Sequence, residues 1–116
     1  MTDRQRLYLA HIVECLDRID DYLPDNKAEF LGDTMRQDAL IRTLQVLAES
    51  TKRLSDDVKD SRPDVDWAAI AGFRNVLVHE YLVVDLDEVW KVATRDLSQL
   101  RTAVQDVLRA MGSLDE

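Results

Sequence analysis

The chain has 116 residues, 46% of them hydrophobic, which is enough for one core and predicts a single helical domain over residues 1–116. Its 15 Lys and Arg residues against 23 Asp and Glu residues give a net charge of −8, so it lacks the basic surplus of general nucleic-acid-binding proteins. One cysteine and two histidines exclude an internal disulfide and a zinc-ligand set, and the lack of an apolar leader or a membrane-length apolar stretch predicts a cytoplasmic protein.

Residues 3–22 are expected to form the first helix, because apolar side chains recur there at helical spacing and Pro24 follows. These side chains are Tyr8, Ile12, Cys15, Leu16, Ile19 and Tyr22. His11 lies at the edge of this face and is interpreted as a structural residue.

A second helix is expected to begin near Ala28 or Asp33 and to end near Val58. Its apolar stripe consists of Leu40, Leu44, Leu47, Thr51, Leu54 and Val58. Three further apolar residues lie off this stripe, namely Phe30, Leu31 and Met35. Either the helix breaks near Gly32, with Asp33 as an N-cap, or it is continuous and its start packs against another neighbour such as a second subunit.

The segment 60–64 contains Pro63 and is expected to be a loop. After it, Asp64 or Asp66 caps a helix that runs to about Glu80, and an apolar connection follows over residues 82–84.

The last helix is expected to begin at a capping box over residues 85–88, with Asp85 as the N-cap and Glu88 three residues later. Its apolar residues lie within about 100° of one another around the helix. They are Leu86, Val89, Trp90, Ala93, Leu97, Leu100, Val104, Val107, Leu108 and Met111. Polar residues occupy most of the opposite side, namely Arg95, Asp96, Gln99, Arg101 and Gln105. Four main helices with such stripes predict an antiparallel bundle.

The helix that ends near Glu80 has two distinct faces. Its core face carries Ile70, Phe73 and Leu77, and the opposite face carries Ala68, Ala71, Gly72, Asn75 and His79. Arg74 and Tyr81 flank the second face. A face that only packed against another helix would use the small residues equally well, but it would not need Arg74, Asn75 and His79 beside them.

The sequence Arg74-Asn75-x3-His79-x-Tyr81 resembles the RNxxxHxY signature of HepT-type toxins, which are HEPN-domain proteins. The likeness extends to the flanking segments 67–75 and 84–90, and upstream to 38–42 and 48–50. It implies an all-α, antiparallel four-to-five-helix bundle of the HEPN type that forms a two-fold homodimer.

The resemblance further implies a metal-independent endoribonuclease that needs no cofactor and acts as the toxin of a type VII-like toxin–antitoxin pair. It implies that Arg74 and His79 are catalytic, that Asn75 orients His79 or binds the RNA, and that Tyr81 is adenylylated by an MntA-like nucleotidyltransferase antitoxin. The alternative is a non-catalytic HEPN module that binds nucleotides, or a helical interaction module, partnering a minimal nucleotidyltransferase.

One geometric condition bears on this assignment. Arg74 and His79 lie about 140° apart around an unbroken helix, so a single helix cannot easily bring both to one atom. Two copies that meet across a two-fold axis would place two arginines and two histidines in one cleft. The small residues of the second face would permit that approach.

Overall fold

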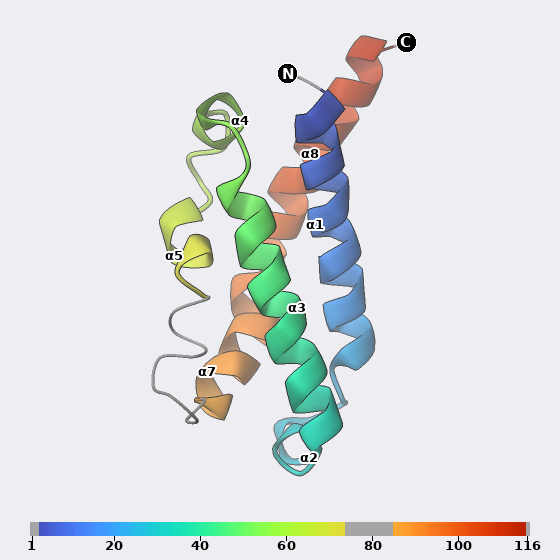
Figure 1. Ribbon diagram of the computed structural model, residues 1–116, viewed down its shortest axis with the longest axis vertical. Coiled ribbons are helices and arrows are strands. Elements are labelled where there is room, and N and C mark those ends of the chain that lie inside the picture. Colours follow the sequence, from blue (N-terminus) through green and yellow to red (C-terminus); the bar gives the residue numbers. More distant parts are fainter. Residues whose placement is uncertain (1–2, 74–84, 116) are drawn as a thin grey trace.

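The computed structural model describes residues 3–73 and 85–115, and these residues form a bundle of helices (Figure 1). In chain order the elements are α1 (Asp3–Tyr22), α2 (Lys27–Leu31), α3 (Thr34–Lys52), α4 (Asp56–Asp60), α5 (Trp67–Ala71), α7 (Leu86–Lys91), the π-helical turn η1 (Val92–Asp96) and α8 (Ser98–Asp115). The predicted all-α fold is confirmed. None of the described helices is both long and apolar enough to cross a membrane.

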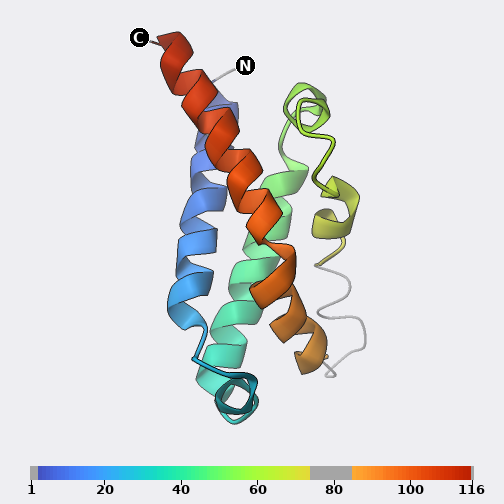
Figure 2. The same ribbon diagram turned by 180° about the vertical axis from the view of Figure 1, so that it is seen from behind.

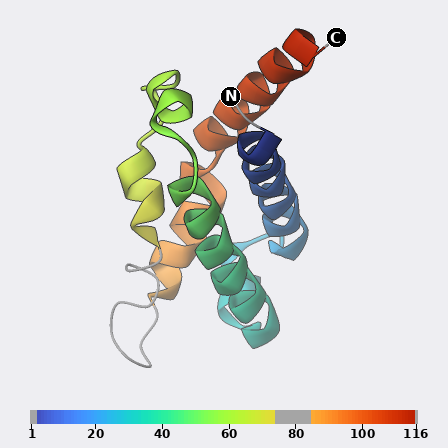
Figure 3. The same cartoon turned by 45° about the horizontal axis from the view of Figure 1, so that its top comes forward.

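The two long helices α1 and α3 run antiparallel and share the most extensive contact in the fold (Figure 1). Seen from behind, α8 crosses them and continues from α7 through η1 in one long rod (Figure 2). The short helix α5 lies beside α3, and α2 lies at the end of the bundle opposite the two termini (Figure 3). The bundle therefore carries α5 and α7 on one side, where the sequence 74–84 joins them.

The predicted apolar stripes form the core. All six stripe residues of the second predicted helix are buried, and so are the apolar residues of α1 that were expected to face inward, apart from the half-buried Tyr8 and Tyr22. Ser50 is buried but bonded, because its Oγ lies 2.8 Å from His11 Nδ1. Within the described residues no buried side-chain nitrogen or oxygen lacks a hydrogen-bond partner. The contact between His11 and Ser50 is consistent with the interpretation of His11 as a structural residue.

The second predicted helix is broken twice. The break at Gly32 is confirmed, and the Asp33 carboxylate caps α3 by accepting a hydrogen bond from the Arg36 N–H at 3.1 Å. The prediction of an unbroken helix to Val58 is wrong, since α3 ends at Lys52. Ser55 starts α4 because its hydroxyl caps Val58 N–H, while its own N–H donates to Gln5 Oε1 at 2.7 Å.

The last helix begins where predicted, at the Asp85 N-cap, but it is not regular throughout. A π-helical turn over Val92–Asp96 separates α7 from α8. Val92 and Ala93 are both buried, so this wider turn lets two neighbouring residues face the core. The predicted stripe gave no indication of this turn, because its residues remain buried or half-buried on both sides of it.

Candidate functional site

The four predicted site residues, Arg74, Asn75, His79 and Tyr81, lie outside the described residues. Leu77 and the apolar connection 82–84 lie outside them as well. The structure therefore describes only the elements that flank this segment in the sequence. One is α5 with Phe73, and the other is Asp85 with α7.

The start of α5 is fixed by a local cap. The Asp66 carboxylate accepts a hydrogen bond from the Ala69 N–H at 3.0 Å, so Asp66 rather than Asp64 is the N-cap. The Trp67 indole N–H donates to the carbonyl oxygens of Lys59 and Arg62, both at 3.1 Å. These bonds tie the first residue of α5 to the end of α4 and to the loop between them.

The loop before α5 is also held to α8 by Arg62. Its guanidinium makes a two-pronged contact with Asp64, at 2.9 and 2.8 Å, and a further contact with Asp106 of α8 at 2.7 Å. Arg62 lowers the pKa of the Asp64 carboxyl to about 2, because its hydrogen bonds favour the charged form. Asp64 is thus an anchor of the loop and not a helix cap.

The predicted helix does not run unbroken from Asp66, because α5 ends at Ala71 with Gly72 as its C-cap. The buried side of α5 is the predicted one. Ile70 and Phe73 are 4% and 7% exposed, which confirms them as core residues. Of the three small residues that precede the motif, Ala68 alone is exposed, and Ala71 and Gly72 are partly covered.

The element that follows the candidate segment, α7, is held by a cap and by contacts with α2. The Asp85 carboxylate accepts from the Glu88 N–H at 3.1 Å and caps α7. Lys27 Nζ lies 2.8 Å from Asp87 Oδ1, and the rings of Phe30 and Trp90 pack with centroids 5.5 Å apart. Both contacts attach α7 to α2.

A groove of about 390 Å³ runs between α5 and the junction of η1 with α8. Ile70, Phe73 and Leu100 contribute apolar lining, and the polar lining includes Asp66, Arg95, Asp96, Ser98 and Gln99. The sequence predicted Arg95, Asp96 and Gln99 as residues of the solvated side, which their exposure confirms. The sequence did not show that they face α5 across a groove, because that contact depends on long-range packing and on the turn η1.

The polar lining of this groove combines one arginine with two carboxylates, so it has no local excess of positive charge. Arg74 directly follows the groove residue Phe73 in the sequence.

Within residues 3–73 and 85–115, no cluster of three or more His, Cys, Asp or Glu side chains could hold a metal ion. Cys15 is buried, and burial raises the pKa of its thiol above the ordinary value. A protonated thiol in the core is a poor nucleophile, so Cys15 is a packing residue.

Comparison with known proteins identifies the family. Residues 12–107 match the family model described as Ribonuclease HepT-like. A protein of Thermococcus cleftensis named a probable ribonuclease HepT is 33% identical over 95 residues, which cover 81% of this chain and 86% of that protein. A protein of Caldanaerobacter subterraneus provisionally named an RNase is 30% identical over 105 residues, covering 90% of this chain and 94% of that protein.

The chain also aligns with part of a longer relative. A Methanocaldococcus jannaschii protein, named a gamma-glutamylcyclotransferase and provisionally an RNase, is 30% identical over 112 residues. These residues are 96% of this chain but 49% of that protein, so the chain spans about half of this relative's length. No solved structure matches the chain. The match over residues 12–107 shows that the chain belongs to the HepT-like ribonuclease family.

Proposed function

We propose that this protein is a metal-independent endoribonuclease that cleaves RNA with Arg74 and His79. The observation that carries the proposal is the family match over residues 12–107, which includes the intact sequence Arg74-Asn75-x3-His79-x-Tyr81. The ribonuclease names of the relatives from Thermococcus cleftensis and Caldanaerobacter subterraneus support the same reaction class.

The proposed reaction uses the RNA's own nucleophile. The 2′-hydroxyl oxygen forms a bond to the neighbouring phosphorus and gives its proton to one histidine. The bond from phosphorus to the 5′-oxygen breaks, and that oxygen takes its electron pair and a proton from a second, protonated histidine. The products are a 2′,3′-cyclic phosphate and a 5′-hydroxyl.

The residue types in the motif suit these roles. An imidazole with an ordinary pKa of about 6.5 can accept or donate a proton near neutral pH. The Arg74 guanidinium offers a fixed fork of donors to the charge that develops on the phosphoryl oxygens. Asn75 is assigned to orient His79 or to bind the RNA.

We assign the active cleft to a homodimer, because an unbroken helix over the motif would separate Arg74 from His79 by about 140°. The exposed Ala68 and the half-buried Ala71 and Gly72 at the end of α5 are small, which supports a close approach of a second backbone. The proposal further makes the protein a cytoplasmic toxin of a type VII-like pair, whose MntA-like nucleotidyltransferase partner silences it by adenylylating Tyr81.

The test is RNA cleavage by purified protein in a buffer that contains EDTA. Arg74→Ala and His79→Ala should each lower the cleavage rate by about two orders of magnitude or more, because each removes a proton-transfer or charge-stabilising group. Circular dichroism should show unchanged helical content, since both positions were predicted to face away from the core. Cleavage that EDTA abolishes and added Mg²⁺ restores would contradict the metal-independent reaction.

Two matched variants serve as controls. Arg42→Ala removes an exposed arginine of α3, and His11→Gln replaces the other histidine while keeping a group that can bond Ser50. Both should cleave RNA at the wild-type rate. Wild-type cleavage by His79→Ala would remove the catalytic assignment and leave the non-catalytic HEPN module as the better reading.

A further inference from the structure

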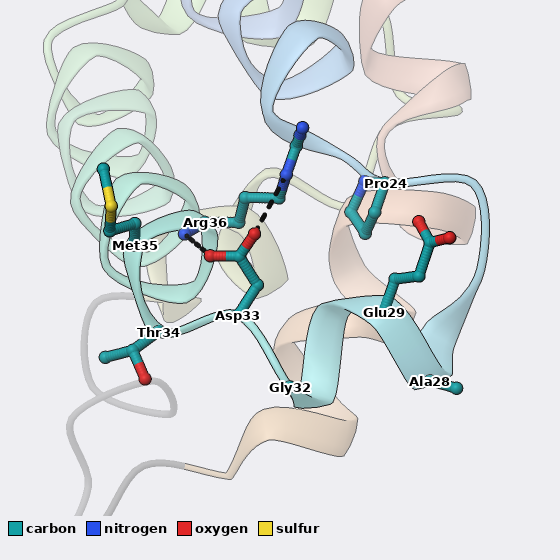
Figure 4. A pocket seen from close by; sticks show the side chains of 8 residues that line it. All are labelled: Pro24, Ala28, Glu29, Gly32, Asp33, Thr34, Met35 and Arg36. Atoms are coloured by element: carbon teal, nitrogen blue, oxygen red, sulfur yellow. Dashed lines mark hydrogen bonds and ion pairs between the residues drawn. The ribbon is translucent and has the colours of Figure 1, made fainter.

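Two large apolar side chains project into solvent at the break between α2 and α3. Met35 is 84% exposed and Leu31 is 45% exposed. Together with the half-buried Tyr22, Pro24 and Ala39 they form what is called here the Met35 patch. It lies at the end of the bundle opposite the termini, around the turn drawn in Figure 4.

Two open grooves flank Met35. One, of about 600 Å³, follows the turn from Pro24 and Ala28 to Arg36. The other, of about 450 Å³ and mainly apolar in lining, lies between Tyr22 of α1 and Ala39 of α3. Both grooves are lined by Asp33, Met35 and Arg36, so the exposed Met35 side chain lies between the two grooves.

The backbone under the Met35 patch is held in place by side-chain bonds. Arg36 donates to the Tyr22 carbonyl oxygen at 2.8 Å and pairs with Asp33 at 3.2 Å, and Figure 4 shows Met35 pointing away from that pair. The Gln37 amide donates to the carbonyl oxygens of Phe30 and Leu31 at 2.9 and 3.1 Å. The patch is therefore a preformed surface, and ordering it on binding costs little.

The rim of the Met35 patch is acidic. Asp21 and Glu29 line the two grooves, and Asp38 lies one helical turn beyond Met35. The described residues include no ion pair for any of these three carboxylates. Two cations of α2 and α3 are already engaged, because Arg36, which lines both grooves, pairs with Asp33 and Lys27 pairs with Asp87.

The negative charge of the rim favours some binding partners over others. A second copy in a two-fold contact at this patch would bring the same carboxylates face to face. RNA and anionic lipid would meet the same repulsion. A helix with apolar residues on one face and Lys or Arg beside them would fill the grooves and neutralise the rim.

We propose that the Met35 patch, flanked by its two grooves and the carboxylates of Asp21, Glu29 and Asp38, docks a basic amphipathic helical segment of a partner protein. The surface lies outside the candidate catalytic motif and does not depend on RNA cleavage. It recognises its partner by apolar contact at Met35 and Leu31, and by charge at the rim.

The test uses a labelled synthetic peptide of Lys and Leu, with Leu at helical spacing, and the purified full chain. Fluorescence anisotropy should show binding that weakens by about tenfold or more in Met35→Ser, because an anchor in the centre of a patch carries most of the affinity. Leu7→Ser is the matched control, since Leu7 is another exposed apolar residue, at 70%, on α1. It should bind as wild type.

The charge component is tested separately. Glu29→Gln combined with Asp38→Asn should weaken binding and reduce its dependence on salt, whereas Asp56→Asn on α4 should change neither. Amide NMR shifts on peptide addition should concentrate between Tyr22 and Ala39. The proposal is overturned if a scrambled peptide of equal composition binds as tightly, or if Leu7→Ser weakens binding as much as Met35→Ser. It is also overturned if sedimentation shows that Met35→Ser dissociates a dimer, because the patch would then bind a second copy.

Discussion

Arg62 is the residue that most directly links the loop before α5 to the rest of the bundle. Its bonds to Asp64 and Asp106 span from that loop to α8, with both carboxylates within 3 Å of the guanidinium. The contact is accessible to solvent, so its contribution to stability is modest and sensitive to salt. Its consequence is positional, since it holds the loop before α5 against α8.

The depressed pKa of Asp64 gives a pH prediction. The folded pKa of about 2 lies below the ordinary value of 3.8, so the contact stabilises the fold fully above pH about 4 and is lost as the pH falls toward 2. NMR titration of the Asp64 carboxyl should show a midpoint near 2 in the wild type. In Arg62→Gln the midpoint should move back toward 4. An Asp64 midpoint near 4 in the wild type would mean that the pair does not form in solution.

Tyr81 gives a second prediction at the residue scale. Co-expression with a cognate nucleotidyltransferase should add whole AMP units to the peptide that contains Tyr81, and mass spectrometry should detect them. An attached AMP places phosphate and bulk near the proposed substrate-phosphate site of Arg74. Tyr81→Phe keeps the ring but lacks the acceptor oxygen, so it should fold normally and resist silencing. Silencing of the Phe variant by the same partner, without any modified peptide, would indicate inhibition by binding alone.

At the scale of the elements, helix starts were easier to predict than helix ends. The capping box predicted Asp85, and Asp33 was one of two alternatives, suggested by apolar residues that lie off the stripe. The start of α5 was predicted at Asp64 or Asp66. The end of α3 at Lys52 was missed because Leu54 and Val58 continue the apolar stripe although the chain turns between them. The π-helical turn was missed for a related reason, since it leaves the predicted stripe facing inward.

The cap at Asp33 can be tested by mutation. Asp33→Ala should lower the free energy of unfolding by about 1 kcal/mol, because the Arg36 N–H loses its acceptor. Thermal unfolding should show a drop of a few degrees. Asp33→Asn retains an acceptor and should cost less, and Asp38→Ala, an exposed position inside α3, should lie within about 0.5 kcal/mol of wild type. Equal losses for Asp33→Ala and Asp38→Ala would show that general charge, and not the cap, is responsible.

At the scale of the molecule, the sequence predicted the helical bundle because its stripes fix which face of each helix is buried. It also identified the family, through residues that are close together in the chain. The groove beside Arg95 and the anchoring of the loop by Arg62 could not be predicted, because both depend on contacts between α8 and segments more than 20 residues away. The proposed arrangement of two subunits would depend on contacts that no single chain contains.

The dimeric cleft is the last prediction, and mixed dimers test it. Arg74→Ala and His79→Ala are each expected to be nearly inactive alone. If one cleft draws arginine from one copy and histidine from the other, a heterodimer of the two variants retains one of each. Co-expressed with different tags and purified in series, it should cleave RNA at least about tenfold faster than either variant, because it keeps one proton-transferring histidine together with one arginine. It should remain slower than the wild type, because it lacks the second histidine of the proposed reaction. Heterodimers of either variant with the Arg74→Ala/His79→Ala double variant should stay inactive. Activity of the mixed dimer that stays at the level of the single variants would contradict a cleft in which the arginine of one copy acts with the histidine of the other.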